Sequence, residues 1–190
     1  MGMKFVTSNK HKFEEVKILL KKFRIGVERV ELKIPEIRGT NEEIAMDAAL
    51  KAYAIIKEPL IVEDSGLFIN GLNGFPGEFS KWVYNKIKPE GILKLMEGVE
   101  DRSAYFKAVV AFANGKEVRT FTGIVEGSIS HEERGDQGFA FDVIFVPKGY
   151  TKTFAEIPEV KAKISHRIKA FEKFAKWLQV NKNYDLGKLS

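Results

Sequence analysis

Apolar and polar positions along the chain follow two different periods, which predict an alternation of strands and helices. Apolar residues recur every three or four positions from Ser8 or Asn9 to about 23, from 42 to about 57 and from 165 to about 180, which predicts three amphipathic helices. Two shorter helices are expected at 78–87 and 90–96. Short apolar or alternating runs predict strands at 3–7, 25–32, 60–63, 105–113, 117–129 and 143–146, and Asn114-Gly115 predicts a hairpin between the two longest.

These elements predict a mixed-sheet α/β or α+β fold. The 190 residues contain no repeat, no low-complexity segment and no change of composition that would mark a linker. A single domain is therefore expected over 1–190, with the last ten residues frayed.

The expected strand at 60–63 ends in an unusual way. Three apolar residues lead into Glu63 and Asp64, although carboxylates are rarely buried without a partner. Neighbouring residues of a regular strand point to opposite faces, so both carboxylates can face one site only if the strand ends at Glu63. The pair Ser65-Gly66 that follows would permit such an end.

Composition and charge narrow the chemistry. The chain has a net charge of +5, with basic residues concentrated at 4–24 and 161–176, which suggests an anionic partner or, alternatively, two solvated helix faces. The absence of cysteine excludes disulfides, thiolate zinc sites and cysteine nucleophiles, and three scattered histidines argue against a histidine metal cluster. Any metal should be hard and oxygen-bound, such as Mg²⁺. Because no apolar run is long enough for a signal peptide or a membrane span, a cytoplasmic protein is expected.

The segment TSNKHK at 7–12 is a candidate anion site between a strand and a helix. Free N–H groups and the helix dipole favour anions at a helix N-terminus, whereas Lys10, His11 and Lys12 oppose the dipole there. Bound phosphates would reverse the sign of that interaction. The alternative is a plain helix cap followed by surface cations, and the segment has no Walker-type glycine loop.

Three further sets of residues could carry chemistry. The first set is acidic. Glu42 and Glu43 are explained by their favourable place at the start of a helix. No such explanation applies to Glu36, Glu63 and Asp64. Within RGDQGFAFDVIFVP at 134–147, aromatic residues flank Asp142 after two glycines, and they could stack on a nucleobase or simply begin a buried strand. In SHR at 165–167, Ser165 is the expected cap of a helix, and His166 and Arg167 could donate to a carbonyl or phosphate oxygen.

Seven short motifs, in order over nearly the whole chain, resemble the inosine triphosphate pyrophosphatases, also called non-standard purine NTP pyrophosphatases. The motifs are Thr7-Ser8-Asn9 with Lys12, Pro35-Glu36, EDSGL at 63–67, GFPG at 74–77, RGDQGFAFD at 134–142, KTFAEI at 152–157 and KAKISHR at 161–167. The resemblance implies a two-lobed α/β fold around a long, twisted mixed sheet flanked by helices, with the active site in the cleft between the lobes. It also implies a homodimer.

The implied reaction is Mg²⁺-dependent hydrolysis of ITP, dITP and XTP to the monophosphate and pyrophosphate, which removes deaminated purines from the nucleotide pool. The implied partner is thus a small purine nucleoside triphosphate, and neither nucleic acid nor a membrane is expected. The resemblance assigns Asp64 as the catalytic proton acceptor on or near the metal, and Glu36 as a metal ligand. Glu63 would be a further metal ligand if the strand ended early, or otherwise a helper behind the ligands.

The resemblance, together with the candidate anion site at 7–12, gives two sets of candidate substrate contacts; Ser8, Lys10 and His11 come from the anion site alone. The candidate phosphate or substrate contacts are Thr7, Ser8, Asn9, Lys10, His11, Lys12, Ser65, Lys51 and Lys81. The candidate base contacts are Phe139, Ala140, Phe141, Asp142, Lys161, His166 and Arg167.

Four positions depart from the usual pattern of the family. Ala140 replaces a frequent glycine, Phe141 a frequent tyrosine or tryptophan, Val143 a frequent proline, and Ala48 a frequent phosphate-binding lysine. Lys51 lies one turn beyond Ala48 on roughly the same face of the helix and could replace that lysine.

The expected mechanism is in-line attack of water on the α-phosphorus. An unperturbed aspartate has a pKa near 3.9 and is a weak general base near neutrality. Either nearby carboxylates raise the pKa of Asp64, or Mg²⁺ makes the water more acidic, and the sequence leaves both open. Three other functions also stay open: a pyrophosphatase of pyrimidine or modified nucleotides, a single-strand-binding module that stacks bases on Phe139 and Phe141, and a non-catalytic nucleotide sensor.

Overall fold

The computed structural model describes residues 2–181, and these divide into two compact units. Unit 1 contains the described residues within 1–64, 108–123 and 167–190, and unit 2 contains 65–107 and 124–166. The chain therefore passes between the units within three strands, and again between His166 and Arg167. We describe each unit separately.

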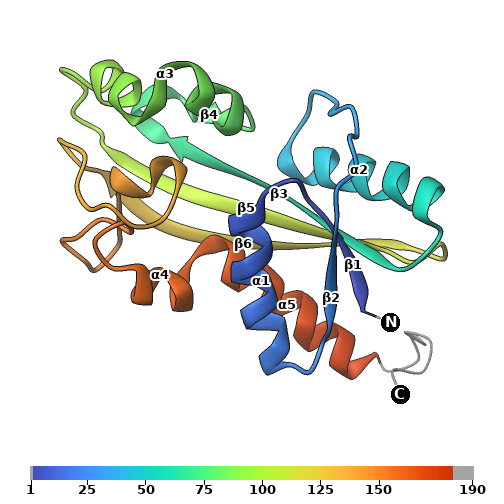
Figure 1. The fold of residues 1–190 in the computed structure, drawn as a ribbon. Coiled ribbons are helices and arrows are strands. Elements are labelled where there is room, and N and C mark those ends of the chain that lie inside the picture. The colour runs from blue at the N-terminus through green and yellow to red at the C-terminus, as the bar shows by residue number, and fades with distance from the viewer. Residues whose placement is uncertain (1, 182–190) are drawn as a thin grey trace. The chain divides into compact units, whose positions relative to one another are not determined.

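The described residues form a seven-stranded mixed sheet, which confirms the predicted fold class (Figure 1). The strands are β1 (Met3–Val6), β2 (Val27–Val30), β3 (Leu60–Ile69), β4 (Pro76–Gly77), β5 (Ser103–Ala113), β6 (Val118–Ile129) and β7 (Phe145–Pro147). Their order is β2-β1-β3-β5-β6-β7, with β4 paired to β3. β1 runs parallel to both β2 and β3, whereas the pairs β3–β4 and β6–β7 are antiparallel.

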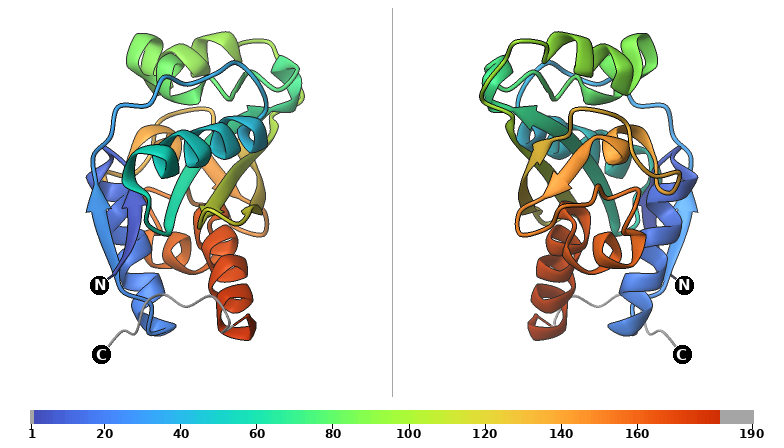
Figure 2. Two further views of the ribbon diagram at one scale, coloured as in Figure 1. Left: turned by 90° about the vertical axis from the view of Figure 1, so that its right-hand side faces the viewer. Right: turned by 90° about the vertical axis from the view of Figure 1, so that its left-hand side faces the viewer.

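In unit 1, helices cover both faces of the sheet (Figures 1 and 2). The helices α1 (Lys10–Lys22) and α5 (His166–Val180) pack side by side in one core with Ile61 of β3. The helix α2 (Asn41–Ile56) packs in a second core with Leu60 and Val62. Alternate residues of β3 therefore face different helices, as strand geometry requires.

The caps of α1 and α2 follow from the sequence. Asn9 is the N-cap of α1, and its side chain accepts a hydrogen bond from the backbone N–H of Lys12 at 3.1 Å. Thr40 and Glu43 form a reciprocal capping box at the start of α2. Such caps satisfy backbone donors that the first turn of a helix leaves open, so the start of each helix is fixed within a residue or two.

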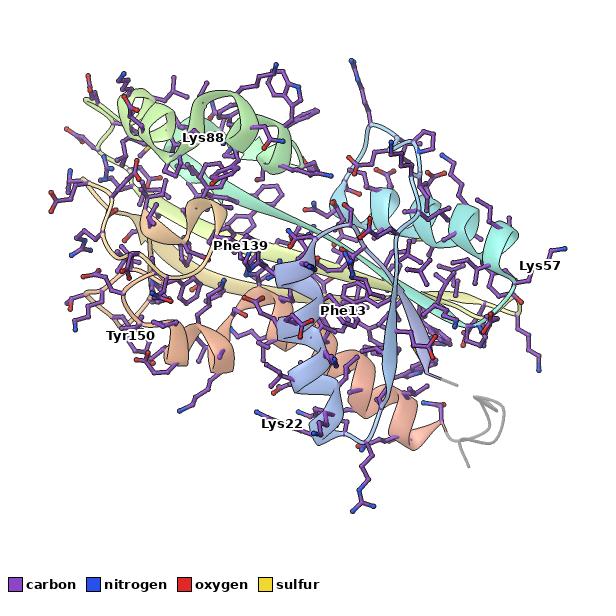
Figure 3. The ribbon with its side chains drawn as sticks, in the orientation of Figure 1. Phe13, Lys22, Lys57, Lys88, Phe139 and Tyr150 are labelled. Atoms are coloured by element: carbon purple, nitrogen blue, oxygen red, sulfur yellow. The ribbon has the colours of Figure 1, made fainter. Side chains whose placement is uncertain are left out.

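Unit 2 contains α3 (Ser80–Leu95), α4 (Pro158–Ile164) and two short 3₁₀ helices, η1 (Asn70–Leu72) and η2 (Ala140–Val143). α3 is kinked at Lys88, where φ is 58° and Pro89 follows (Figure 3). Proline disfavours helical backbone at the residue before it. The two predicted helices at 78–87 and 90–96 therefore correspond to the two halves of α3.

Several predicted boundaries differ from the structure: β2 is shorter than the predicted 25–32, β5 begins two residues before the predicted 105, and β3, β7 and α4 also differ. The predicted end of the third strand at Glu63 is wrong, because β3 continues to Ile69. Ser65-Gly66 does not break the strand, since Gly66 lies so close to the carbonyl of Gly77 that a Cβ could not fit. β7 begins two residues later than predicted, because η2 occupies 140–143, and α4 had no predicted counterpart.

Two further expectations were a frayed C-terminus and the absence of a membrane-spanning helix. The expected fraying of the last ten residues falls, Asn181 apart, outside the described part of the chain. Between residues 2 and 181, no helix is both long and apolar enough to cross a membrane.

Candidate active site

The continuation of β3 sends its two carboxylates to opposite faces of the sheet. Leu60 and Val62 pack with α2, and Asp64 continues this series, with its side chain hydrogen-bonded to Asn41 of α2 at 2.6 Å. Ile61 packs with α1 and α5, and Glu63 continues that series toward Lys12 and Arg167. Adjacent residues of one strand thus have two separate environments.

Asp64 lies in an environment that favours its neutral form. Burial is the largest influence and raises the pKa of Asp64 to about 6 from an ordinary value of 3.8. The hydrogen bond from Asn41 and the charge of Lys12 lower this pKa, and the charges of Glu63 and Glu36 raise it. The pKa is therefore raised mainly by desolvation, with the neighbouring carboxylates as a smaller contribution. A carboxylate with this pKa suits proton transfer near neutral pH.

Glu63 has a fully buried side chain held by two cations. Its Oε2 lies 2.7 Å from Nζ of Lys12, and its Oε1 lies 3.4 Å from Nε of Arg167. Arg167 is 1% exposed and also pairs with Glu15 of α1, at 2.6 Å from NH1 to Oε2. Buried charges are stable in proteins when they are paired in this way.

The segment at 7–12 combines a helix cap with a cluster of cations. Oγ1 of Thr7 accepts from the backbone N–H of Asn9 at 3.1 Å, and Asn9 in turn caps Lys12. Ser8, Lys10 and His11 are exposed. The plain-cap interpretation therefore accounts for Thr7 and Asn9, whereas three cations in the first turns of α1 stay unexplained by capping.

Glu36 lies exposed in the loop before α2, near enough to Asp64 for its charge to raise the pKa of that carboxyl. Lys51 does not point into open solvent: its Nζ binds Oδ2 of Asp47 at 2.6 Å and the carbonyl oxygen of Pro35 at 3.4 Å. Lys51 thus ties α2 to the residue before Glu36, and its expected role in place of a lysine at Ala48 stays a prediction. Among residues 2–181, no group of three or more His, Asp or Glu side chains could by itself hold a metal ion.

In unit 2, three candidate base contacts lie together. Nζ of Lys161 binds Oδ2 of Asp142 at 2.7 Å, and it also lies over the ring of Phe139 at 4.4 Å from the centroid. Oδ2 of Asp142 also accepts from the backbone N–H of Phe139 at 2.8 Å. Phe139, labelled in Figure 3, is partly exposed in the loop before η2. Asp142 and Lys161 are buried.

The other candidates in unit 2 have mixed environments. Phe141 is 1% exposed and packs edge-on against Tyr84, so its ring belongs to the core of this unit. His166 is buried, with its ring stacked on Phe106 at 4.7 Å between centroids. Ser65 is partly buried within β3, and Lys81 is exposed in the first turn of α3. Burial of Lys161, His166 and Arg167 excludes the solvated-face interpretation for these three residues.

Ala140 adopts a backbone conformation that usually requires glycine. Its φ is 56°, in the left-handed region, at the first residue of η2. This conformation favours glycine and costs an alanine roughly 1 kcal/mol.

The variant Ala140→Gly is therefore expected to stabilise the protein by about 0.5–1 kcal/mol, part of the strain relief being offset by the larger unfolded-state entropy of glycine. The corresponding rise in Tm is about 1–4 °C and can be measured by calorimetry. Ala54→Gly, at an exposed position inside α2, is the matched control and should destabilise by about 1 kcal/mol. A lower Tm for Ala140→Gly would contradict the assignment of strain.

Sequence reasoning did not identify Asn41 and Glu15. Asn41 is fully buried and contacts Asp64, and Glu15 pairs with Arg167 across 152 positions of the chain. In the sequence, Asn41 looks like an ordinary first-turn residue of α2, and Glu15 looks like part of the solvated face of α1. No local pattern distinguishes them, because their burial and pairing depend on tertiary structure.

Comparison with known proteins gives the family. The model of the Ham1 family matches residues 3–177. The dITP/XTP pyrophosphatase of Saccharolobus solfataricus is 49% identical over 92% of this chain and 92% of its own, and that of Ignicoccus hospitalis is 51% identical over 92% and 95%. The chain belongs to the Ham1 family.

Solved structures agree with this assignment. A HAM1 protein from Coxiella burnetii has a TM-score of 0.82 at 30% identity, and covers 94% of this chain and 99% of its own. The nucleoside-triphosphatase / dITP/XTP pyrophosphatase from Mycobacterium abscessus has a TM-score of 0.73 at 28% identity, and covers 92% and 97%. The predicted resemblance is thereby confirmed at the level of family and fold.

Proposed function

We propose that this protein hydrolyses dITP, XTP and ITP to the nucleoside monophosphate and pyrophosphate, and so removes deaminated purines from the nucleotide pool. The chain is an enzyme of the nucleoside-triphosphate pyrophosphatase class, as its relatives named dITP/XTP pyrophosphatase indicate. The observation that carries the proposal is Asp64, a partly buried carboxylate whose pKa is raised to about 6 and which lies near enough to Lys12 of α1 to feel its charge.

The proposed reaction starts with a water molecule beside Asp64. Asp64 removes a proton from the water as the water oxygen attacks the α-phosphorus in line with the leaving pyrophosphate. Lys12, with Lys10 and His11 in the same turn, would offset negative charge on the triphosphate, and the N–H groups at the start of α1 add to this. Thr7, Ser8, Asn9, Ser65, Lys51 and Lys81 stay proposed substrate contacts.

We further propose Mg²⁺ as the cofactor, held by Glu36 and Asp64. These two carboxylates lie close enough for the charge of Glu36 to raise the pKa of Asp64, and such a pair supplies the hard oxygen donors that Mg²⁺ prefers. Because Mg²⁺ commonly takes only one or two carboxylates together with waters and substrate phosphates, two ligands fit the ion even without a third side chain. When bound, the ion would offset charge on the phosphates and make water more acidic. Glu63 faces the other side of β3 and is left out of this set.

Base recognition is assigned to Arg167, His166 and the cluster of Phe139, Asp142 and Lys161, with Ala140 and Phe141 shaping the loop. Hypoxanthine and xanthine carry a 6-oxo acceptor where adenine carries a 6-amino donor. Donors such as the guanidinium N–H groups of Arg167 would therefore favour the deaminated base, and a site built on such hydrogen bonds discriminates by up to about 10⁴-fold.

Turnover across a panel of nucleotides tests the proposal. With Mg²⁺ present, dITP, XTP and ITP are expected to release pyrophosphate at least about 10²-fold faster, in kcat/KM, than ATP. Chelation with EDTA is expected to abolish turnover. Equal turnover of ITP and ATP, or release of phosphate in place of pyrophosphate, would contradict the proposal.

The same panel separates the alternatives. Preference for UTP or dTTP would indicate a pyrimidine enzyme, and ITP binding without pyrophosphate release would indicate a sensor. Steeply salt-dependent binding to single-stranded DNA would indicate a nucleic-acid-binding module. A homodimer in the cytoplasm stays a prediction, which light scattering and cell fractionation would check.

A further inference from the structure

Glu63 connects two parts of the candidate site within unit 1. Its side chain is fully buried, with Oε2 2.7 Å from the ammonium of Lys12 and Oε1 3.4 Å from Nε of Arg167. Lys12 belongs to the turn that would bind the triphosphate, and Arg167 is a proposed base contact. One carboxylate is thus shared by a phosphate contact and a base contact.

We propose that Glu63 is a positioning residue that couples phosphate binding at Lys12 to the charge of Arg167. The proposal rests on the proposed function, because it takes Lys12 and Arg167 as contacts of one nucleotide. It assigns to Glu63 a role other than the metal ligand that the sequence suggested.

The coupling follows from sharing one negative charge between two cations. Interactions among charges are strong where water is excluded, and the carboxylate of Glu63 has no exposed surface. While Arg167 is present, its guanidinium satisfies part of the Glu63 charge. When Arg167 is removed, Lys12 alone must compensate the buried carboxylate, so its ammonium is held more tightly and is less available to a phosphate.

The exposure of Lys12 and the pairing of Arg167 support this coupling. Lys12 comes from the first turn of α1 and is 17% exposed at its side chain, so it has a path to a ligand. Arg167 is 2% exposed at its side chain and pairs with Glu15 as well as with Glu63, so two carboxylates hold its guanidinium in place. Asp64 lies on the opposite face of β3, where it accepts a hydrogen bond from Asn41, and the charge of Lys12 reaches it and lowers its pKa.

Inorganic tripolyphosphate is the probe, because it has phosphates but no base. Its binding to the full chain is measured by calorimetry in the presence of Mg²⁺. Arg167→Met is expected to weaken tripolyphosphate binding by about five-fold or more, although the probe has no base for Arg167 to contact. In a Glu63→Gln background the same substitution is expected to change binding by less than about two-fold, since the shared carboxylate charge is gone.

Two further variants separate coupling from structure and from bulk charge. Arg167→Lys keeps a cation beside Glu63 but loses the planar fork, so tripolyphosphate binding should return to within about two-fold of wild type while selectivity for dITP over dATP stays impaired. Lys176→Met removes an exposed positive charge from the same helix and should leave binding unchanged.

The outcomes are distinct. Equal effects of Arg167→Met in both backgrounds, or no effect in either, would overturn the coupling. If Glu63→Gln fails to fold, Glu63→Asp replaces it, because aspartate keeps the negative charge but has a shorter side chain. In this background the effect of Arg167→Met on tripolyphosphate binding should be measurably smaller than in the wild-type background. An undiminished effect overturns the coupling. If the wild type binds tripolyphosphate but hydrolyses neither dITP nor XTP, the proposed function fails while the coupling is still decided by binding.

Discussion

Asp64→Asn is expected to abolish turnover and, at the same time, to stabilise the folded protein at pH 8. Removal of a positioned general base typically costs about 10²–10⁴-fold in rate, which sets the expected loss of kcat with saturating Mg²⁺. The amide can still accept the hydrogen bond from Asn41, so the fold around α2 should be kept.

The gain in stability follows from the raised pKa of Asp64. The folded-state pKa is about 6 and the ordinary value is 3.8, so the folded protein binds this proton more tightly than the unfolded chain. Below pH 4 the carboxyl is protonated in both states and costs nothing. As pH rises through 6 the folded state must ionise a desolvated group, and the penalty, about 2–3 kcal/mol, is then complete. Asparagine avoids this penalty.

Thermal unfolding of Asp64→Asn and wild type should therefore diverge between pH 4 and pH 7, with the variant more stable at the higher pH. Asp101→Asn is the matched control. Hydrogen bonds from Ser103 lower the pKa of Asp101, so its carboxylate stabilises the fold above its ordinary pKa, and that stabilisation is lost as pH falls. The control should lose stability at high pH and keep its activity. Near-wild-type turnover of Asp64→Asn would exclude the base role.

Local signals in the sequence predicted much of the fold. Asn9 is an efficient helix cap, and Asn114-Gly115 is a favoured hairpin turn between the two longest strands. Each of these signals acts through atoms within a few residues, so it can be recognised from the sequence alone. The intermixed strands and helices predicted a mixed sheet, whereas the order of its strands joins residues far apart and was not predicted.

The errors of the sequence analysis have tertiary causes. Ser65-Gly66 resembles a strand end, but Gly66 is required because the carbonyl of Gly77 passes where a side chain would lie. The helix α4 begins with Pro158 in its first turn, a readable start signal, yet it has too few apolar residues to give a clear period. The early strand end led directly to the candidate metal role of Glu63.

The same contrast between local and tertiary information applies to the residues of the candidate site. The sequence identified which residues carry charge, whereas it did not reveal which charges are buried or with whom they pair. Glu15 and Asn41 were missed for this reason, and the metal-ligand alternative for Glu63 depended on a strand end that the structure does not have. Burial decides the energetics of these residues, because a buried charge costs several kcal/mol, on the order of 3–5, once its partner is lost.

Loss of Lys161 is expected to be among the most destabilising single changes in unit 2. Lys161→Met would leave the carboxylate of Asp142, which is 3% exposed, without its ammonium partner at 2.7 Å. The expected cost is about 3–5 kcal/mol, or a fall in Tm of about 6–20 °C for a chain of this size, measured by calorimetry. The cation over the ring of Phe139 would be lost as well, so the loop before η2 should become less ordered.

A second substitution distinguishes unpaired charge from lost packing. In Lys161→Met/Asp142→Asn the buried charge is gone, while the amide oxygen can still accept from the N–H of Phe139, so most of the lost stability should return. Lys163→Met, at an exposed position of the same helix, should change stability by no more than about 0.5 kcal/mol. If the double variant is as unstable as Lys161→Met alone, packing of the lysine stem, and not the ion pair, stabilises this cluster. Phe139 and Asp142 are proposed base contacts. Lys161→Met/Asp142→Asn should therefore still have impaired selectivity for deaminated purines, even though its stability is restored. This result would separate the structural contribution of the Lys161–Asp142 pair from its role in base recognition.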